Sequence, residues 1–214
     1  MPDGAFNSIY QLFAAHEPAE AVRRLRLELF HQAAHGFNRG YQIVPVELAA
    51  TANAAPEADR VLASLGLDLQ FLGGQQGSAA DDTQLTVSVA VRLGLLTRML
   101  GMSWTHLSAR RSFGTKTTRH QLIKAEFADL SSQCSLLVLQ WEMRIAAQDF
   151  QDAEDDHWQI TQLTNRAEKL MGGHGYLLGA THTLSYLSMM FYSLHGKTTG
   201  HYAAARRDGL EGAI

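Results

Sequence analysis

The sequence predicts an all-α protein in which residues 81–214 form an antiparallel four-helix bundle. Two long segments repeat apolar residues every three or four positions, which is the period of a buried helix face. All four prolines lie in the first 56 residues, so no proline interrupts the later segments. The chain has 214 residues and is 46% hydrophobic, which is enough for one sizeable core.

The N-terminal segment, residues 1–80, is mixed. Residues 1–16 have no clear periodicity, and the first clean signal is a proline in the first turn of an apolar-periodic stretch. Runs of β-branched residues and of alternating apolar and polar residues then indicate extended backbone. The expected elements are a helix from Pro18 to about Gly36, extended pieces at 41–48 and 67–72, a short helix over 56–65 and a linker at 73–80.

The first bundle helix is expected from Asp81 to about Ser112. Acidic residues at its start cap the free N–H groups and suit the positive end of the helix dipole. At ~1.5 Å per residue it is about 40 Å long, and an apolar stripe of that length requires equally long partner helices. The stripe consists of Leu85, Val89, Leu93, Leu96, Leu100, Trp104 and Leu107.

Further apolar stripes predict the partner helices. The second helix is expected from Arg119 to about Gln148, with a stripe of Ile123, Phe127, Leu130, Cys134, Leu137, Trp141 and Ile145. A third helix runs from the acidic cluster at 152–156 to Leu170, where a glycine cluster stops it. A fourth follows Thr181, and a short last helix covers 202–210. The connections are short, as in an antiparallel bundle.

Composition excludes several classes of function. The net charge is −3 without any Lys/Arg run, so nucleic-acid binding is not expected. No leader pattern and no apolar run of the roughly 18 residues that a membrane span needs is evident, and Cys134 is the single cysteine. A soluble protein of the reducing cytoplasm is expected. The acidic cluster at 152–156 is explained by helix capping, so no metal site is predicted.

Two separated motifs resemble the C-terminal helical domain of the acyl-CoA dehydrogenase family. That family has an Arg three residues before Phe-Gly, a Gln seven residues after the Gly, and Ala-Asp later on the same helix. This chain has Arg110, Phe113-Gly114, Gln121 and Ala128-Asp129 in the same spacing. The family's Gln-x-x-Gly-Gly-x-Gly-Tyr motif corresponds to residues 169–176. The resemblance covers about residues 83–210.

The resemblance implies FAD as cofactor, because in this family the bundle of one subunit reaches the flavin of its neighbour. Arginine suits the pyrophosphate, and bare glycine backbone suits an anion. Arg110 is equally explained as a cation in the last turn of a helix, where it needs no ligand. The candidate cofactor contacts are Arg110, Ser112, Phe113, Gln121, Lys169, Gly172, Gly173 and Gly175.

The chain also departs from the family pattern. Residues 1–80 are too short for the family's N-terminal helical and middle β-domains, so the flavin ring has no evident home. The glutamate that removes the substrate proton in many members is replaced by His195, and Lys169 replaces a glutamine. His195 is either a base in altered form, since histidine titrates near pH 6.5, or a loop residue without a role.

Three hypotheses follow. The first is a truncated acyl-CoA dehydrogenase-like subunit that shares a flavin site with a fuller partner chain and oxidises an acyl thioester. The second is a flavin-independent enzyme on the same bundle, for cyclisation, elimination or hydration. The third is a non-catalytic dimerisation or scaffold bundle. The expected assembly is a homo-oligomer, or a hetero-oligomer with a flavoprotein subunit.

Overall fold

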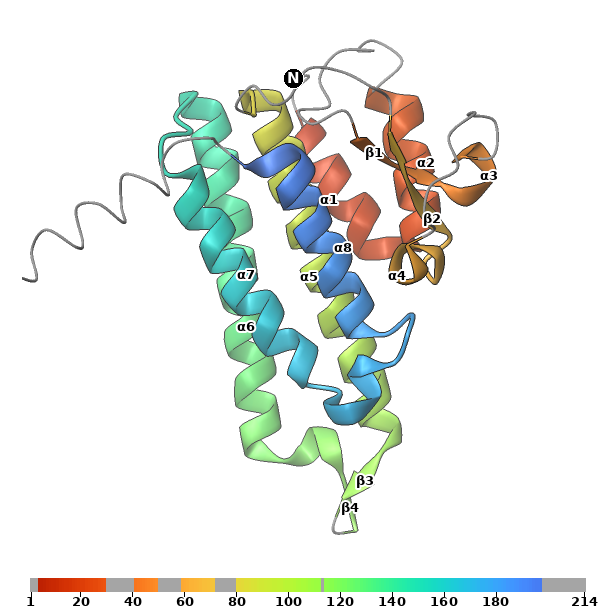
Figure 1. The fold of residues 1–214 in the computed structure, drawn as a ribbon. Helices are drawn as coiled ribbons and strands as arrows, with labels where there is room; N and C mark the ends of the chain where they lie inside the picture. Colours follow the sequence, from red (N-terminus) through yellow and green to blue (C-terminus); the bar gives the residue numbers. More distant parts are fainter. Residues whose placement is uncertain (1–3, 30–40, 50–58, 72–79, 113, 198–214) are drawn as a thin grey trace, which may run out of the picture.

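The structure is a computed structural model that describes residues 4–29, 41–49, 59–71, 80–112 and 114–197. It confirms the all-α fold: long helices pack side by side along most of the molecule (Figure 1), and the only strands in these residues form two small sheets. The four bundle helices are α5 (Asp82–Ala109), α6 (Gln121–Ala147), α7 (Ala153–Lys169) and α8 (Thr181–Phe191).

α5 is the central helix of the bundle. Its N-terminus is closed by a capping box, in which the Asp81 carboxylate accepts from the Gln84 N–H and the Gln84 side chain accepts from the Asp81 N–H. Every residue from Leu85 to Leu96 is buried, because α1, α6, α7 and α8 all pack against α5. By length and composition α5 could cross a membrane, contrary to expectation. However, 78% of its most apolar window is buried inside the protein, as in a core helix.

The predicted stripes of the bundle helices form the core, with two deviations. Trp104 in the stripe of α5 is 43% exposed, although its ring packs edge-on against Phe127 at 5.1 Å. α5 also ends at Ala109 rather than Ser112. The cause is a hairpin in which β3 (Arg111–Ser112) pairs with β4 (Thr115–Lys116), followed by a 3₁₀ turn at Thr117–Arg119 that leads into α6.

One core helix was not expected from the sequence. α1 (Ala5–Ala15) buries Phe6, Ile9 and Phe13 against α5. Phe6 stacks on Trp141 of α6 with ring centroids 6.3 Å apart, and Phe13 packs edge-on against Phe191 of α8 at 5.6 Å. The N-terminal segment and the bundle therefore share one core, while the division of the chain at residue 80 stays a prediction.

The rest of the N-terminal segment lies beside the bundle (Figure 1). The extended pieces are confirmed as one antiparallel pair, but residues 46–48 are helical. The first strand ends at Pro45, which pairs with Leu67, the first residue of the second strand. Directly before Leu67, Gly66 adopts φ 70°, a conformation that favours glycine. The elements are α2 (Pro18–Leu29), β1 (Tyr41–Pro45), α3 (Val46–Ala49), α4 (Arg60–Ala63) and β2 (Leu67–Phe71).

Two short turns complete the described chain. A 3₁₀ turn at Gly172–Tyr176 connects α7 to α8, and a π-helical turn at Tyr192–Gly196 follows α8. The expected continuation of α2 to Gly36, the start of the short helix at Pro56, the linker at 73–79 and the last helix at 202–210 lie outside the described residues.

Candidate functional site

Most of the predicted cofactor contacts lie at one end of the bundle. Arg110 ends α5, Ser112 belongs to the hairpin, and Gln121 begins α6. The imidazole rings of His106 on α5 and His174 in the 3₁₀ turn stack with centroids 4.5 Å apart and join this end to the glycine cluster. Three segments that are distant in the sequence thus meet here.

Ion pairs hold the α6 and α7 parts of this end together. Arg166 of α7 donates from Nε to Glu126 at 2.9 Å and from a terminal nitrogen to Asp129 at 2.6 Å, both on α6. These contacts lower the pKa of the Asp129 carboxyl below its usual value. The C-terminus of α7, with Lys169 exposed beside the glycines, is therefore fixed next to the N-terminal half of α6.

The glycines of the cluster have different surroundings. Gly172, at φ 58°, and Gly173 are exposed, and a Cβ added to either would meet nothing within 4 Å. Gly175 is buried, and a Cβ there would lie 2.6 Å from Oγ1 of Thr181 and 2.9 Å from the Glu168 carbonyl oxygen. Gly172 and Gly173 leave their backbone open to a ligand, whereas Gly175 is required by the protein's own packing.

This end of the bundle is also basic. Between Asp82 and Glu126 the sequence contains no acidic residue. The exposed cations of the hairpin and its surroundings are Arg110, Arg111, Lys116, Arg119 and Lys124. Such a surface favours an anionic group such as a phosphate, and the fork of an arginine can bind two phosphate oxygens at once. Phe113 lies outside the described residues.

His195 is at the opposite end of the bundle. It belongs to the π-helical turn, where a Cβ on Gly196 would lie 2.7 Å from Oγ of Ser88 near the start of α5. Ser88 and Arg110 are 22 residues apart on or at the end of α5, which is roughly 33 Å at 1.5 Å per residue. His195 is 7% exposed, and burial lowers its pKa to about 4. It is neutral at pH 7 and a weak base, and its catalytic role stays a prediction.

A buried polar cluster close to His195 is not apparent from the sequence. Its centre is Arg92, whose side chain is completely buried in the middle of α5. Nε of Arg92 donates to Oγ of Ser188 at 3.1 Å, and one terminal nitrogen donates to Oγ1 of Thr161 at 2.6 Å. The other donates to Nδ1 of His157 at 2.8 Å and to the His157 carbonyl at 3.1 Å. One arginine thus binds α5 to α7 and α8.

The charge of Arg92 is balanced indirectly. The guanidinium lies 5.2 Å from the centre of the Tyr192 ring, and the Tyr192 hydroxyl donates to the Glu154 carboxylate at 2.8 Å. Burial lowers the pKa of Arg92 to about 10, so it stays charged at neutral pH. Burial, together with the adjacent charge of Arg92, keeps the pKa of His157 well below its usual value. The sequence signal was a single charge within the apolar run Leu85–Leu96.

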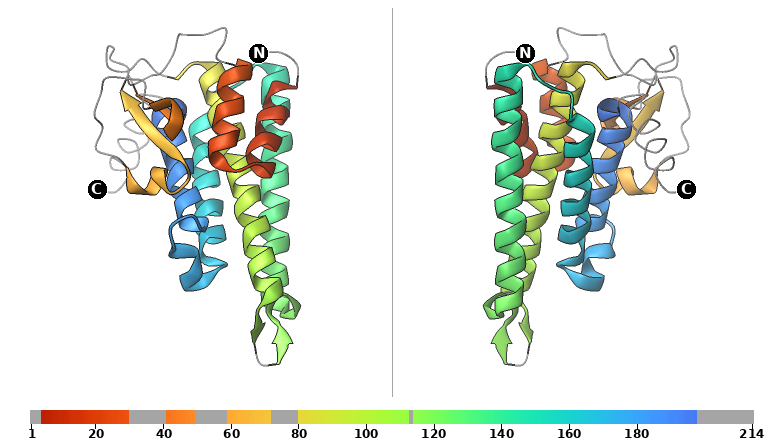
Figure 2. Two further views of the ribbon diagram at one scale, coloured as in Figure 1. Left: turned by 90° about the vertical axis from the view of Figure 1, so that its right-hand side faces the viewer. Right: turned by 90° about the vertical axis from the view of Figure 1, so that its left-hand side faces the viewer.

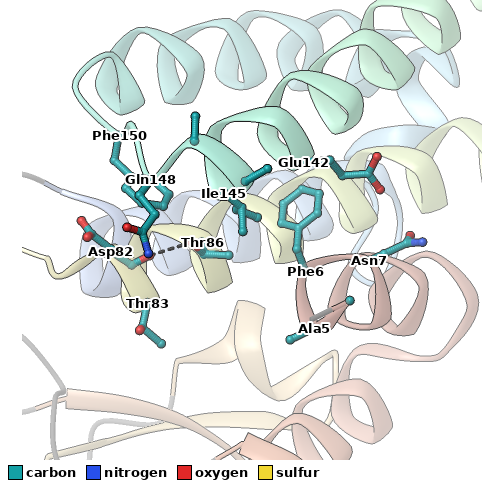
Figure 3. A pocket seen from close by; sticks show the side chains of 13 residues that line it. Ala5, Phe6, Asn7, Asp82, Thr83, Thr86, Glu142, Ile145, Gln148 and Phe150 are labelled. Carbon is teal, nitrogen blue, oxygen red and sulfur yellow. Dashed lines mark hydrogen bonds between the residues drawn. The ribbon is translucent and has the colours of Figure 1, made fainter. Parts of the chain in front are cut away.

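A pocket of about 980 Å³ lies at the end of the bundle opposite to Arg110, between α1 and the ends of α5 and α6. In Figure 3, Asp82, Thr86 and Gln148 lie on one side of it, and Phe6 and Glu142 lie on the other. Asp82 and Glu142 supply carboxylates here, and the positive N-terminal ends of α1 and α5 lie beside the pocket together with the negative C-terminal end of α6. Within the described residues, no three His, Cys, Asp or Glu side chains are grouped to hold a metal.

No protein-family model and no curated protein matches the sequence. Solved structures with a similar fold include an acyl-CoA dehydrogenase from Geobacillus kaustophilus, with TM-score 0.47 and 14% identity over 73% of this chain and 48% of that one. An electron transferring flavoprotein of Acidaminococcus fermentans has TM-score 0.47 and 15% identity over 75% and 46% of the two chains.

A putative acyl-CoA dehydrogenase from Mycobacterium smegmatis has TM-score 0.44 and 17% identity over 82% of this chain and 50% of that one. This chain thus spans about half the length of the solved structures that it resembles. At these scores and identities the resemblance concerns the overall fold, and it carries no information about ligand or activity.

Proposed function

We propose that this protein is an acyl-CoA dehydrogenase-like subunit that contributes one wall of a flavin site shared with a fuller partner chain. One observation carries the proposal. Arg110, Ser112 and Gln121 lie at the same basic end of the bundle as the open backbone of Gly172 and Gly173, and the stacked rings of His106 and His174 link the two parts. These residues match the two family motifs and come from separate parts of the chain.

The surroundings fit the phosphate part of FAD. The guanidinium of Arg110 is exposed and can donate two parallel hydrogen bonds to phosphate oxygens. Gly172 and Gly173 are exposed and a Cβ on either would meet nothing within 4 Å, so a ligand can approach their backbone. The absence of acidic residues from the hairpin removes the repulsion that a pyrophosphate would otherwise meet.

The described residues contain no comparable site for the flavin ring. The described residues contain two two-stranded sheets and no larger β-structure that could enclose the ring. We therefore assign the ring, and the acyl thioester that it would oxidise, to the partner chain. When bound, the flavin would accept a hydride from the α,β-carbon pair of the substrate.

The residues of this chain would bind and orient the cofactor. Arg110 and the glycine amides would hold the phosphates, and Gln121 would offer an amide to the adenine end. His195 lies too far from this end to reach the same ligand, and its pKa of about 4 makes it a weak base. We assign removal of the substrate proton to the partner chain.

FAD binding tests the proposal directly. The purified chain is titrated with FAD, alone and together with a flavoprotein of the acyl-CoA dehydrogenase class that co-purifies with it, and flavin fluorescence is recorded. Arg110→Ala is expected to raise the dissociation constant of FAD in the complex on the order of tenfold to a hundredfold. Arg60→Ala removes an exposed arginine from α4 and serves as the matched control.

Two results would overturn the proposal. One is a chain that binds no FAD in either sample. The other is a loss of affinity that is equal for Arg110→Ala and Arg60→Ala. A colourless protein that still converted a substrate would instead favour a flavin-independent enzyme.

A further inference from the structure

α6 carries a second apolar stripe on the face opposite the core. Leu136, Leu139 and Met143 are 64%, 56% and 73% exposed. Small exposed residues continue the same face: Ala125, Ala128, Ser132 and Ala146. Steps of three and four residues place all seven on one line along the helix, which we call the outer stripe. A helix that is apolar on two opposite faces is typical of a helix that is buried on both.

Within the described residues, nothing covers the outer stripe. Both side views of the molecule show α6 along one edge of the bundle (Figure 2). The exposed fractions of its three large side chains give the same result. These side chains form a line over two helical turns rather than scattered single residues, and a line of this kind indicates an interaction site.

The shape of the outer stripe is complementary to a second copy of itself in the antiparallel orientation. Its large residues lie in the C-terminal half and its small residues lie mainly in the N-terminal half, about a midpoint near residue 134. If a second α6 is placed antiparallel on this midpoint, every large side chain meets a small one, so the two surfaces interdigitate without overlap. The facing pairs are Met143 with Ala125, Leu139 with Ala128, and Leu136 with Ser132.

The charges beside the outer stripe have the same symmetry. Lys124 and Glu142 are both exposed and are 18 residues apart, or about five turns, so they lie on the same flank of α6. A two-fold axis that relates two antiparallel helices keeps equal flanks on the same side. Each Lys124 would therefore lie beside the Glu142 of the other copy. A parallel pair would place them on opposite sides and separate them.

We propose that the outer stripe of α6 is a homodimer interface, in which α6 packs antiparallel against α6 of a second copy of this chain. Self-complementarity of shape and of charge about one midpoint is the property of an isologous contact around a two-fold axis. A partner of different sequence would not need this symmetry. The proposal does not rest on flavin binding.

The first test measures the oligomeric state of the full chain by sedimentation equilibrium. The wild-type protein is expected to be a dimer at micromolar concentration, and Leu139→Lys is expected to raise the dimer dissociation constant at least about a hundredfold, because two lysines would be buried in the interface. Leu27→Lys is the matched control, since Leu27 on α2 is 57% exposed, against 56% for Leu139. Helix content by circular dichroism shows that both variants remain folded.

The second test distinguishes antiparallel from other arrangements. Lys124→Glu or Glu142→Lys alone places like charges beside each other twice in the dimer and is expected to weaken it roughly tenfold. The double variant restores opposite charges and is expected to return the dissociation constant to within about threefold of wild type. Arg60→Glu makes the same charge change away from α6 and is expected to leave the dimer unchanged.

A wild-type chain that is monomeric at up to about 100 µM would overturn the proposal. A dimer that Leu139→Lys leaves intact, or a double charge variant that stays as weak as the single ones, would also overturn it. These measurements are independent of FAD, so their failure is distinct from failure of the proposed function.

Discussion

Arg92 donates a hydrogen bond of 2.8 Å to Nδ1 of His157, and both side chains are buried. Arginine has no acceptor atom, so Nδ1 must be the acceptor and the neutral imidazole carries its proton on Nε2. A protonated His157 would instead turn an N–H toward the guanidinium. The contact therefore requires a neutral His157, next to an Arg92 that stays charged at neutral pH, inside a core formed by α5, α7 and α8.

Removal of Arg92 should destabilise the protein strongly. Arg92→Ala leaves a cavity in the middle of α5 and removes the donors that satisfy Ser188, Thr161 and His157. We expect the free energy of unfolding in urea to fall by about 3–5 kcal/mol. Arg23→Ala removes an arginine whose side chain is 42% exposed and forms ion pairs at the surface, and it should change stability little. Equal effects of the two variants would contradict a structural role for Arg92.

Acid should destabilise the fold through its buried histidines. The pKa of His195 is about 4 in the folded protein and about 6.5 in the unfolded chain, and that of His157 is lowered in the same direction. Below pH 6.5 the unfolded chain binds protons that the folded protein does not. The contribution of these histidines to the free energy of unfolding is therefore complete above about pH 6.5 and is lost toward pH 4. The His195 contribution amounts to about 3 kcal/mol.

His195→Gln isolates this contribution. Denaturation in urea between pH 4 and pH 7 should show a shallower loss of stability for the variant than for wild type, because glutamine does not titrate. Other groups, including Asp156 with its raised pKa, remain in both proteins and cancel in the comparison. Parallel pH profiles would show that His195 is not a buried neutral histidine.

Two glycines of α5 should respond in opposite ways to the same substitution. A Cβ on Gly94 would lie 2.6 Å from the Tyr10 carbonyl oxygen and 2.7 Å from Cβ of Phe13, where α1 crosses α5. Gly94→Ala is expected to cost about 1–3 kcal/mol in thermal or urea unfolding. A Cβ on Gly101 meets nothing within 4 Å, so Gly101→Ala should stabilise the helix by about 0.5–1 kcal/mol. Stabilisation by both would refute the packing of α1 on α5.

The glycine cluster offers a similar pair. Gly175→Ala places a methyl group against Thr181 and the Glu168 backbone and should lower the melting temperature. Gly173→Ala meets open space and should leave the melting temperature within a few degrees of wild type. If the proposed function holds, Gly173→Ala should nevertheless weaken FAD binding in the complex, because the methyl group narrows the approach to the backbone. Fluorimetry with FAD and thermal unfolding measure the two effects separately.

Sequence periodicity predicted the bundle because the apolar stripe of a long helix depends only on residues three or four positions apart. Phe127, Leu130 and Cys134 follow each other at helical spacing, and each is buried in α6. α1 could not be predicted from periodicity, although Phe6, Ile9 and Phe13 are all buried. A helix of eleven residues with three buried side chains gives only a weak periodic signal in the sequence. The position of α1 depends instead on Gly94, because α1 packs against α5 where Gly94 has no side chain.

The candidate site shows the same division. Motif spacing identified Arg110, Gln121 and the glycines, and it could not show that Gly172 and Gly173 are open while Gly175 is enclosed. That difference depends on Thr181 and on the Glu168 carbonyl, which are brought to Gly175 by the path of the chain between α7 and α8. The buried cluster around Arg92 could not be predicted, because an isolated charge in an apolar run does not indicate which residues it will contact.

The sequence by itself determined the number, length and core faces of the long helices, because these follow from residues one or two turns apart. Only the tertiary structure decided that Arg92 meets His157, and that Arg110 and His195 lie at opposite ends of the bundle. Arg92 and His157 are 65 residues apart in the sequence, and Arg110 and His195 are separated along most of the length of α5. Both relationships depend on how the helices pack against one another, which local sequence does not determine.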